Sequence, residues 1–231
     1  MRHAIYYAPP PGSRLHRLGS AWLGRDAVSG EPAKQPPVTG LKEATAEPAR
    51  YGFHATLKAP FALNPGMKRV ELGDAVALIA AQMETVVIPS LKLREIDGFL
   101  ALVPDRQDRV LSFLGEICVC GLDSFRAKPS DEELARRRAA NLTVRLEQNL
   151  MKWGYPYVLD EFRFHMSLTQ KLPDSERQTF MKAAQVHFAP VLEQPLEVDA
   201  LTVFAETRPE RNFVVEERFP LLHSVSVRIA S

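Results

Sequence analysis

Hydrophobic and polar positions along the chain predict an alternation of short strands and amphipathic helices. The apolar stretch Ala4–Ala8 indicates a strand, which a run of prolines ends. Apolar side chains that recur every three or four residues predict helices carried by Leu15, Leu18 and Trp22, by Leu72, Val76, Ile79 and Met83, by Val110, Leu114 and Ile117, and by Phe180, Ala184 and Phe188. We expect Asp105 and Asp174 to cap the last two of these helices, and Pro190 to end the final one.

The remaining apolar runs predict hairpins and a final strand: Ser90–Ile96 with Phe99–Val103, Leu196–Ala205 with Phe213–Phe219, and Val225–Ile229. The first hairpin turns at Asp97-Gly98, because glycine adopts the positive φ of a tight turn without strain. The second turns near Arg208-Pro209-Glu210. Residues 24–50 are rich in proline and glycine, so no helix or central strand is expected there. A long loop of this kind is interpreted as a mobile segment or as a flap over a site.

Ser130 and Glu133 have the spacing of a capping box, which predicts one long helix that runs to Trp153. The triplet Arg136-Arg137-Arg138 lies in its early turns. One interpretation is a contact with phosphate or RNA. The other, which we favour, is a solvent-exposed face that pairs with nearby glutamates on the same helix.

Two segments share a pattern that is absent elsewhere. Tyr51–Lys58 contains Phe-His-Ala-Thr-Leu, and Phe162–Thr169 contains Phe-His-Met-Ser-Leu. Side chains alternate between the two faces of a strand, so each histidine shares a face with the hydroxyl residue two positions later. The pairs are His54 with Thr56, and His165 with Ser167.

The two segments belong to a longer repeated arrangement. In each half of the chain a strand with a histidine precedes a helix and a hairpin. Gly98 follows His54 by 44 residues, and Pro209 follows His165 by the same number. This spacing predicts an internal duplication in a single domain that covers residues 1–231, with a first repeat at about 50–104 and a second at about 160–220.

Composition indicates an ordinary globular protein. The chain has 231 residues, of which 45% are hydrophobic and 25% charged, and its net charge is +1. This balance argues against binding to extended nucleic acid, although it allows a local basic pocket. There is no apolar run of membrane-spanning length and no signal-peptide pattern, so we expect a cytoplasmic protein with no membrane partner. Cys118 and Cys120 are expected to be reduced thiols rather than a disulfide or a zinc site.

The paired histidines suggest acid–base chemistry at phosphorus. Cleavage of a phosphodiester without a metal requires one group that accepts a proton from the attacking oxygen and another that protonates the leaving oxygen, and histidine can do either near neutral pH. Hydroxyls can donate to the non-bridging oxygens, where negative charge accumulates. A metal site is a weaker alternative, because no carboxylate lies at ligand spacing from the pair. The other histidines are expected to be structural: His3, His16, His187 and His223.

Three further residues are candidates for substrate contacts. By strand alternation Lys58 shares the face of His54, which suggests a second phosphate contact, with a solvated strand end as the alternative. Tyr6 and Tyr51 are candidates for cleft walls, although core packing is the favoured interpretation for both.

The two segments resemble the paired His-x-Thr/Ser signatures of the 2H phosphoesterase superfamily. The longer strings Arg2–Tyr7, Trp22–Asp26 and Arg50–Lys58 resemble one branch of it, the uncharacterised family encoded in bacterial phosphonate-utilisation (carbon–phosphorus lyase) operons. The resemblance covers essentially the whole chain. Threonine is common where Ser167 stands, so we expect the same hydroxyl with slightly looser positioning.

The resemblance implies an α+β, bilobal 2H phosphoesterase fold, with two pseudo-symmetric lobes of antiparallel sheet plus helices around a central cleft that holds the four motif residues. It also implies action on cyclic phosphates and 2′-5′ linkages without a metal or cofactor.

We therefore predict a metal-independent phosphodiesterase that hydrolyses a small cyclic phosphodiester. One of His54 and His165 activates water and the other protonates the leaving oxygen, while Thr56 and Ser167 bind the phosphoryl oxygens. The operon resemblance suggests a phosphoribosyl cyclic phosphate as substrate. The alternatives are a protein that processes 2′,3′-cyclic phosphates or 2′-5′ linkages at short RNA ends, and a non-catalytic protein that binds a phosphorylated ligand.

Overall fold

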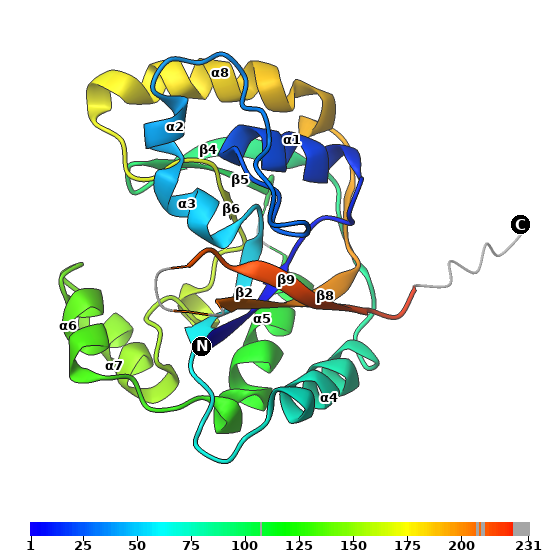
Figure 1. The fold of residues 1–231 in the computed structure, drawn as a ribbon, viewed down its shortest axis with the longest axis vertical. Coiled ribbons are helices and arrows are strands. Elements are labelled where there is room, and N and C mark those ends of the chain that lie inside the picture. The colour runs from blue at the N-terminus through cyan, green and yellow to red at the C-terminus, as the bar shows by residue number, and fades with distance from the viewer. Residues whose placement is uncertain (107, 207, 209–210, 224–231) are drawn as a thin grey trace, which may run out of the picture.

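The computed structural model describes residues 1–106, 108–206, 208 and 211–223, and strands and helices are interleaved along them (Figure 1). The helices are α1 (Arg14–Leu23), α2 (Leu41–Ala44), α3 (Ala46–Tyr51), α4 (Arg69–Ala80), α5 (Arg109–Gly121), α6 (Asp131–Arg138), α7 (Val144–Trp153) and α8 (Asp174–Leu192), with short 3-10 turns at Asp123–Phe125 and Leu159–Glu161. The strands are β1 (Arg2–Tyr7), β2 (Ala55–Phe61), β3 (Val86–Ile88), β4 (Leu91–Ile96), β5 (Phe99–Pro104), β6 (Met166–Ser167), β7 (Leu196–Val198), β8 (Ala200–Glu206) and β9 (Val214–Pro220).

One antiparallel sheet runs through the centre of the molecule. In the described part of the chain it has seven strands in the order β4-β5-β6-β2-β1-β8-β9, and β3 pairs with β7 separately. Helices α1 and α8 pack at one end, where α8 contacts β4 and β5, and helices α4 and α5 pack at the other, where they contact β2, β8 and β9. Figure 1 shows these two groups of helices on opposite sides of the strands. The α+β class with antiparallel sheet that we expected is confirmed.

The two halves of the chain follow the same order of elements. A strand, a helix, a short strand and a hairpin occur as β2-α4-β3-β4-β5 and again as β6-α8-β7-β8-β9. The short strands pair with each other, with Val87 opposite Glu197. Each helix covers the hairpin of the other half, since α8 packs on β4 and β5 and α4 packs on β8 and β9. The two halves therefore interlock.

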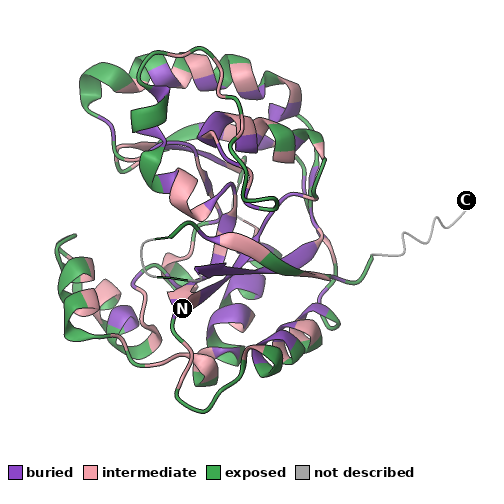
Figure 2. Ribbon diagram, in the orientation of Figure 1, coloured by how far each residue is buried: buried purple, intermediate pink, exposed green. Residues whose placement is uncertain are grey.

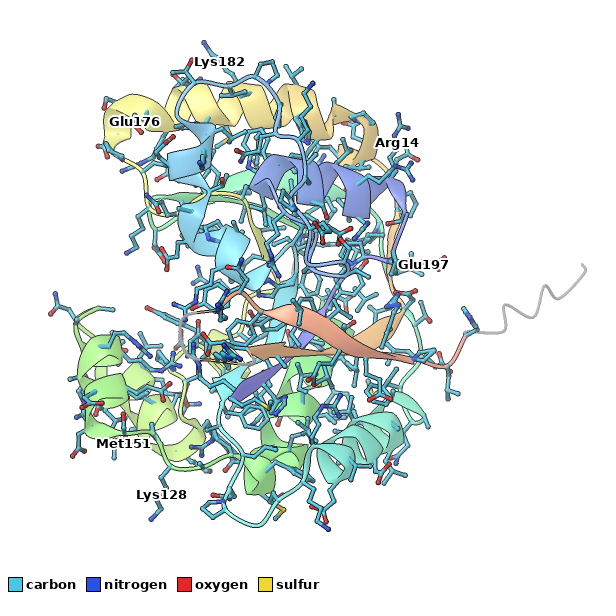
Figure 3. The ribbon with its side chains drawn as sticks, viewed as in Figure 1. Arg14, Lys128, Met151, Glu176, Lys182 and Glu197 are labelled. Atoms are coloured by element: carbon cyan, nitrogen blue, oxygen red, sulfur yellow. The ribbon has the colours of Figure 1, made fainter. Side chains whose placement is uncertain are left out.

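Burial is greatest on the central strands (Figure 2). The indole of Trp22 on α1 is fully buried and donates a hydrogen bond of 2.9 Å to the carbonyl of Leu168, just after β6. Figure 3 shows Glu176 and Lys182 of α8 projecting away from the sheet. No helix in the described residues is long and apolar enough to cross a membrane.

The single long helix predicted after Ser130 is wrong, because the chain forms α6 and α7 with a turn between them. Asn141 adopts a φ of 51°, a left-handed conformation that asparagine tolerates better than most residues. Thr143 then starts the second helix, and its hydroxyl accepts a hydrogen bond from the backbone N–H of Leu146. The turn conformation at Asn141 and the helix cap at Thr143 therefore interrupt the helix, although the apolar spacing is continuous.

Two predicted helix boundaries also differ. The N-cap of α5 is Asp108 rather than Asp105, because the Asp108 carboxylate accepts from the N–H groups of Val110 and Leu111. Helix α8 begins at Asp174 with Pro173 as its N-cap, and it continues past Pro190 to Leu192. A proline so near the end removes only one helical hydrogen bond, while Leu192 still gains burial in the core.

Residues 24–50 are more regular than predicted, since they contain α2 and most of α3. Pro48 is the third residue of α3, where a backbone N–H has no acceptor within the helix. Leu41 and Ala44 of α2 are buried in the core. The expected turn at Pro209-Glu210 and the final strand Val225–Ile229 lie outside the described residues.

The close packing of α1 against the first histidine segment gives a test. A Cβ added at Gly19 would lie 2.2 Å from the ring of Phe53, the residue before His54. We expect Gly19→Ala to lower the free energy of unfolding by about 1–3 kcal/mol, as overpacking does, measured by urea denaturation. The control is Gly121→Ala, also in a helix, where the added Cβ would lie 3.4 Å from Ile79. Equal or higher stability of Gly19→Ala than of the control would contradict this packing.

Candidate active site

The pairing of β2 with β6 brings the two histidine segments together. Ala55 pairs with Met166 in antiparallel register, and both side chains are fully buried on one face. Extending this register by one residue places the four motif residues opposite one another on the other face: His54 opposite Ser167, and Thr56 opposite His165. Directly opposed side chains in such a pair have Cβ atoms about 4.5–5.5 Å apart. The predicted convergence of two imidazoles and two hydroxyls is therefore what the sheet register produces.

Both imidazoles are held by the same kind of hydrogen bond. Nδ1 of His54 lies 2.9 Å from the carbonyl oxygen of Gly52, and Nδ1 of His165 lies 2.8 Å from that of Arg163. A carbonyl oxygen only accepts, so Nδ1 carries the proton and donates it in both cases. In each neutral ring Nε2 is consequently the nitrogen that can accept a proton, and it can deliver that proton once it holds it. Gly52 has a φ of 78°, a conformation that favours glycine and that orients this carbonyl.

The hydroxyl of Thr56 contacts the reactive nitrogen of His54 directly. Thr56 Oγ1 lies 3.1 Å from His54 Nε2. Because Nδ1 holds the ring proton, the hydroxyl donates to Nε2. A bound phosphoryl group would offer this hydroxyl a charged acceptor and release Nε2 for catalysis.

Aromatic rings enclose the two imidazoles unequally. Tyr6 of β1 stacks on His54 with ring centroids 3.7 Å apart and an interplanar angle of 23°. Tyr51 lies 6.3 Å and Phe204 6.1 Å from the same ring. His165 has Phe99 at 5.6 Å. Tyr6 and Tyr51 therefore both lie beside His54, although Tyr6 is also part of a buried cluster, as expected from core packing.

The pKa values of both histidines are lowered. The pKa of His54 is lowered to about 4, mainly by burial. The hydrogen bond to the Gly52 carbonyl opposes this shift, and the charge of His165 contributes to it. Burial also lowers the pKa of His165, against the effect of the Arg163 carbonyl. Both rings are accordingly neutral at pH 7 when no anion is bound.

Lys58 does not face the histidines as strand alternation predicted. Tyr6 pairs with Thr56 but Ile5 pairs with Lys58, so β2 contains an irregularity that inserts one extra residue. The alternation of faces is thereby broken, and Lys58 Nζ donates to the carbonyl of Val119 at 2.9 Å, at the end of α5. Burial lowers its pKa to about 8, although Asp123 at 3.7 Å opposes this. Its role is to hold α5 against β2.

The remaining candidate residues have structural surroundings. Cys118 and Cys120 are free thiols, and burial raises the pKa of Cys118 to about 12. Three of the histidines outside the motifs contact a carboxylate or a carbonyl: His3 with Glu216, His16 with Asp26, and His187 with the Leu18 carbonyl. His223 is exposed. Within the described ranges no three His, Cys, Asp or Glu side chains are grouped as a metal ion would require.

Sequence reasoning missed several residues beside the site. Phe204 and Glu206 lie on β8, and Tyr155 follows α7. The alternation within β8 places Phe204 and Glu206 on one face. The pairing of β1 with β8, in which Tyr6 lies opposite Thr202, shows that this face adjoins Tyr6. Such a pairing between distant segments has no local sequence signal.

Residues 56–214 match the protein family described as "Protein of unknown function (DUF1045)". This chain belongs to that family. It is also 39% identical over 228 residues to a protein of Janthinobacterium sp. (strain Marseille) named "Ribose 1,5-bisphosphate phosphokinase PhnN", a match that covers 95% of this chain and 50% of the relative. A protein of the same name from Laribacter hongkongensis (strain HLHK9) is 36% identical over 208 residues, which are 89% of this chain and 48% of the relative. The chain thus spans about half the length of these relatives.

Solved structures with a similar arrangement include a phosphoesterase, with a TM-score of 0.44 and 13% identity over 96% of this chain and 98% of that one. Another is E. coli LigT complexed with 3'-AMP, with a TM-score of 0.44 and 12% identity over 95% and 97% of the two chains.

The lowered pKa of His54 predicts a pH-dependent loss of stability. The unfolded histidine has its ordinary pKa of 6.5 and the folded one about 4, so the unfolded state binds more protons between these values. Folding stability should therefore decrease as the pH falls through this window, by up to about 3 kcal/mol from this residue. Urea unfolding at pH 7 and pH 5 should show a smaller difference for His54→Gln than for the wild type.

The control is His223→Gln, which replaces an exposed histidine outside the site. It should leave the wild-type pH dependence unchanged. If His54→Gln and the wild type lost equal stability on acidification, the burial of the His54 ring would not have the effect described here.

Proposed function

We propose that this chain is a metal-independent phosphodiesterase that hydrolyses a small cyclic phosphodiester. The observation that carries the proposal is the matched setting of two imidazoles on one face of the β2–β6 pair. Each holds its Nδ1 proton on a carbonyl two residues earlier, and each has a hydroxyl residue opposite it across the pair. This arrangement supplies a proton acceptor, a proton donor and two hydrogen-bond donors on one face of the strand pair.

In the proposed reaction, Nε2 of one histidine removes a proton from water as the water oxygen attacks phosphorus. The bond between phosphorus and one ring oxygen of the cyclic diester breaks, and the other histidine protonates that oxygen. The product is a phosphate monoester with a free hydroxyl. The base then loses its added proton to solvent and the acid takes one up, which returns both histidines to their starting protonation states. The hydroxyls of Thr56 and Ser167 donate to the non-bridging oxygens.

The surroundings favour His54 as base and His165 as acid. His54 is stacked under Tyr6 and its pKa is about 4, which keeps Nε2 unprotonated at neutral pH. His165 has fewer aromatic neighbours, with Phe99 at 5.6 Å. A bound anionic phosphodiester raises the pKa of both rings, and the less enclosed ring then gains its proton more readily.

Two observations favour a phosphorylated ribose as the substrate. The relatives are named for a kinase that acts on ribose 1,5-bisphosphate. Consider ribose 5-phosphate with a cyclic phosphodiester that joins O1 to a neighbouring hydroxyl oxygen. Cleavage of the bond between phosphorus and that neighbouring oxygen would leave the phosphate on O1 and produce such a bisphosphate. The resemblance to phosphonate-operon proteins points to the same substrate, a phosphoribosyl cyclic phosphate.

Activity of histidine variants tests the proposal. With ribose and nucleoside cyclic phosphates in the presence of a chelator, the wild type should produce monoesters, and His54→Ala and His165→Ala should each lower kcat/KM by about 10²–10⁴-fold, as the loss of a general acid or base does. The control His16→Ala should retain activity. Binding of these compounds without turnover would contradict the proposed catalysis and favour a non-catalytic binder.

The same reaction should show a bell-shaped dependence of kcat on pH, because one histidine must be neutral and the other protonated in the substrate complex. Replacement of the base should abolish the fall of activity at acidic pH, and replacement of the acid should abolish the fall at alkaline pH. We expect the acidic limb to disappear in the residual activity of His54→Ala. Loss of the alkaline limb in that variant would reverse the assignment of the two roles.

A further inference from the structure

Three arginines each lie over an aromatic ring: Arg2 over Phe213, Arg50 over Tyr51 and Arg137 over Tyr155. Arg137 of α6 is the middle member of the arginine triplet, and its side chain is only 15% exposed. Its guanidinium carbon lies 4.9 Å from the ring centroid of Tyr155, and Nη2 donates to Glu133 at 2.8 Å. Its Nε is buried and has no hydrogen-bond partner among the described residues. The predicted exposure of the triplet is confirmed for Arg136 and Arg138, and the predicted pairing with a glutamate of the same helix is confirmed for Arg137, which is half-buried.

A second guanidinium with the same incomplete bonding comes from α3. Arg50 lies over Tyr51, with 5.9 Å between the guanidinium carbon and the ring centroid, and Nη2 binds the carboxylate of Glu206. Its Nε is also buried and without a partner in the described ranges. Arg2 of β1 binds the other oxygen of Glu206 at 2.7 Å. Both carboxylate oxygens of Glu206 thus accept hydrogen bonds, one from Arg2 and one from Arg50. The Nε–H of Arg50 has no acceptor among the described residues.

Tyr6 connects this arginine group to the catalytic histidines. Its ring stacks on His54. Burial raises the pKa of its hydroxyl, as do Tyr51 and Tyr155, whereas Arg2 and Arg137 lower it. Tyr51, which contacts Arg50, also lies 6.3 Å from the His54 ring, so the arginine group adjoins the ring of the first histidine.

The charge of this region suits an anion. Arg2, Arg50 and Arg137 are opposed by Glu133 and Glu206, which leaves one positive charge. Two buried N–H donors of these arginines have no acceptor in the part of the chain that the structure describes. An unpaired buried donor is unfavourable, and an oxygen-rich anion would satisfy it. Guanidinium groups bind phosphate oxygens with well-defined geometry, and a phosphate monoester has three such oxygens.

We propose that Arg137, together with Arg50 and the hydroxyls of Tyr51 and Tyr155, forms a second anion site that binds a non-cyclic phosphate monoester of the substrate. The proposal rests on the proposed function, because it assigns the cyclic phosphate to the two histidines. It deepens that function by making the enzyme selective for cyclic phosphodiesters that carry an additional phosphate. Glu133 holds Arg137 in place when the site is empty.

The test compares two substrates that differ only in the second phosphate: a ribose cyclic phosphodiester with and without a phosphate on its 5-hydroxyl. The wild type should hydrolyse the phosphorylated compound with a kcat/KM about 10- to 100-fold higher, the range expected for a charge-assisted hydrogen-bond site. Arg137→Ala should reduce this ratio to near 1, mainly through KM, because the lost contact binds ground state and transition state alike. Arg137→Gln serves as a second variant if the alanine variant is unstable.

Arg136→Ala is the matched control, since it removes the same charge from the neighbouring, exposed position of α6. It should keep the wild-type ratio. An unchanged ratio in Arg137→Ala, or an equal reduction in Arg136→Ala, would overturn the proposed site.

Calorimetric binding of the same two compounds separates this proposal from the proposed reaction. If neither compound is hydrolysed, the proposed reaction fails, but the anion site still predicts tighter binding of the phosphorylated compound and loss of that preference in Arg137→Ala. Equal affinities of the wild type for the two compounds would overturn the anion site alone.

Discussion

The antiparallel pairing of Ala55 with Met166 is the constraint on which this molecule depends. It joins two segments that are 111 residues apart in the sequence at the centre of the sheet. The buried side chains of this pair anchor the strands in the core, and the alternation of a strand then directs both imidazoles and both hydroxyls to the opposite face. A shift of one residue in this register would turn the motif side chains toward the core and destroy the site.

The interlocking of the two halves explains how so short a pairing is maintained. Strand β6 has only two residues, too few to be stable alone. It is held by β5 on its other side and by the bond from the Trp22 indole to the Leu168 carbonyl. Because each half supplies the helix that covers the hairpin of the other, neither half has a complete core without its partner. The repeated order of elements thus gives matched histidines, and their aromatic neighbours differ.

Sequence reasoning reached those features that have a local signal. The repeat of Phe-His-apolar-hydroxyl-Leu, read with the period of a strand, was enough to place His54, Thr56, His165 and Ser167 on one face. Lys58 was misplaced because a strand irregularity, which depends on pairing with β1, has no mark in the sequence. The break between α6 and α7 did have a local sequence signal: Asn141 adopts a left-handed turn conformation and Thr143 caps the second helix. The regular apolar spacing nevertheless favoured one continuous helix. The half-buried position of Arg137 and the stacking of Tyr6 on His54 depend on contacts between distant segments.

The central claim is that the two imidazoles act on one phosphorus atom. A crystal structure of the protein with a cyclic phosphorothioate, which resists hydrolysis, tests it most directly. We predict that phosphorus will lie between His54 Nε2 and His165 Nε2, with the non-bridging atoms within hydrogen-bonding distance of the Thr56 and Ser167 hydroxyls. A ligand bound elsewhere, or one that contacts only a single histidine, would contradict the account.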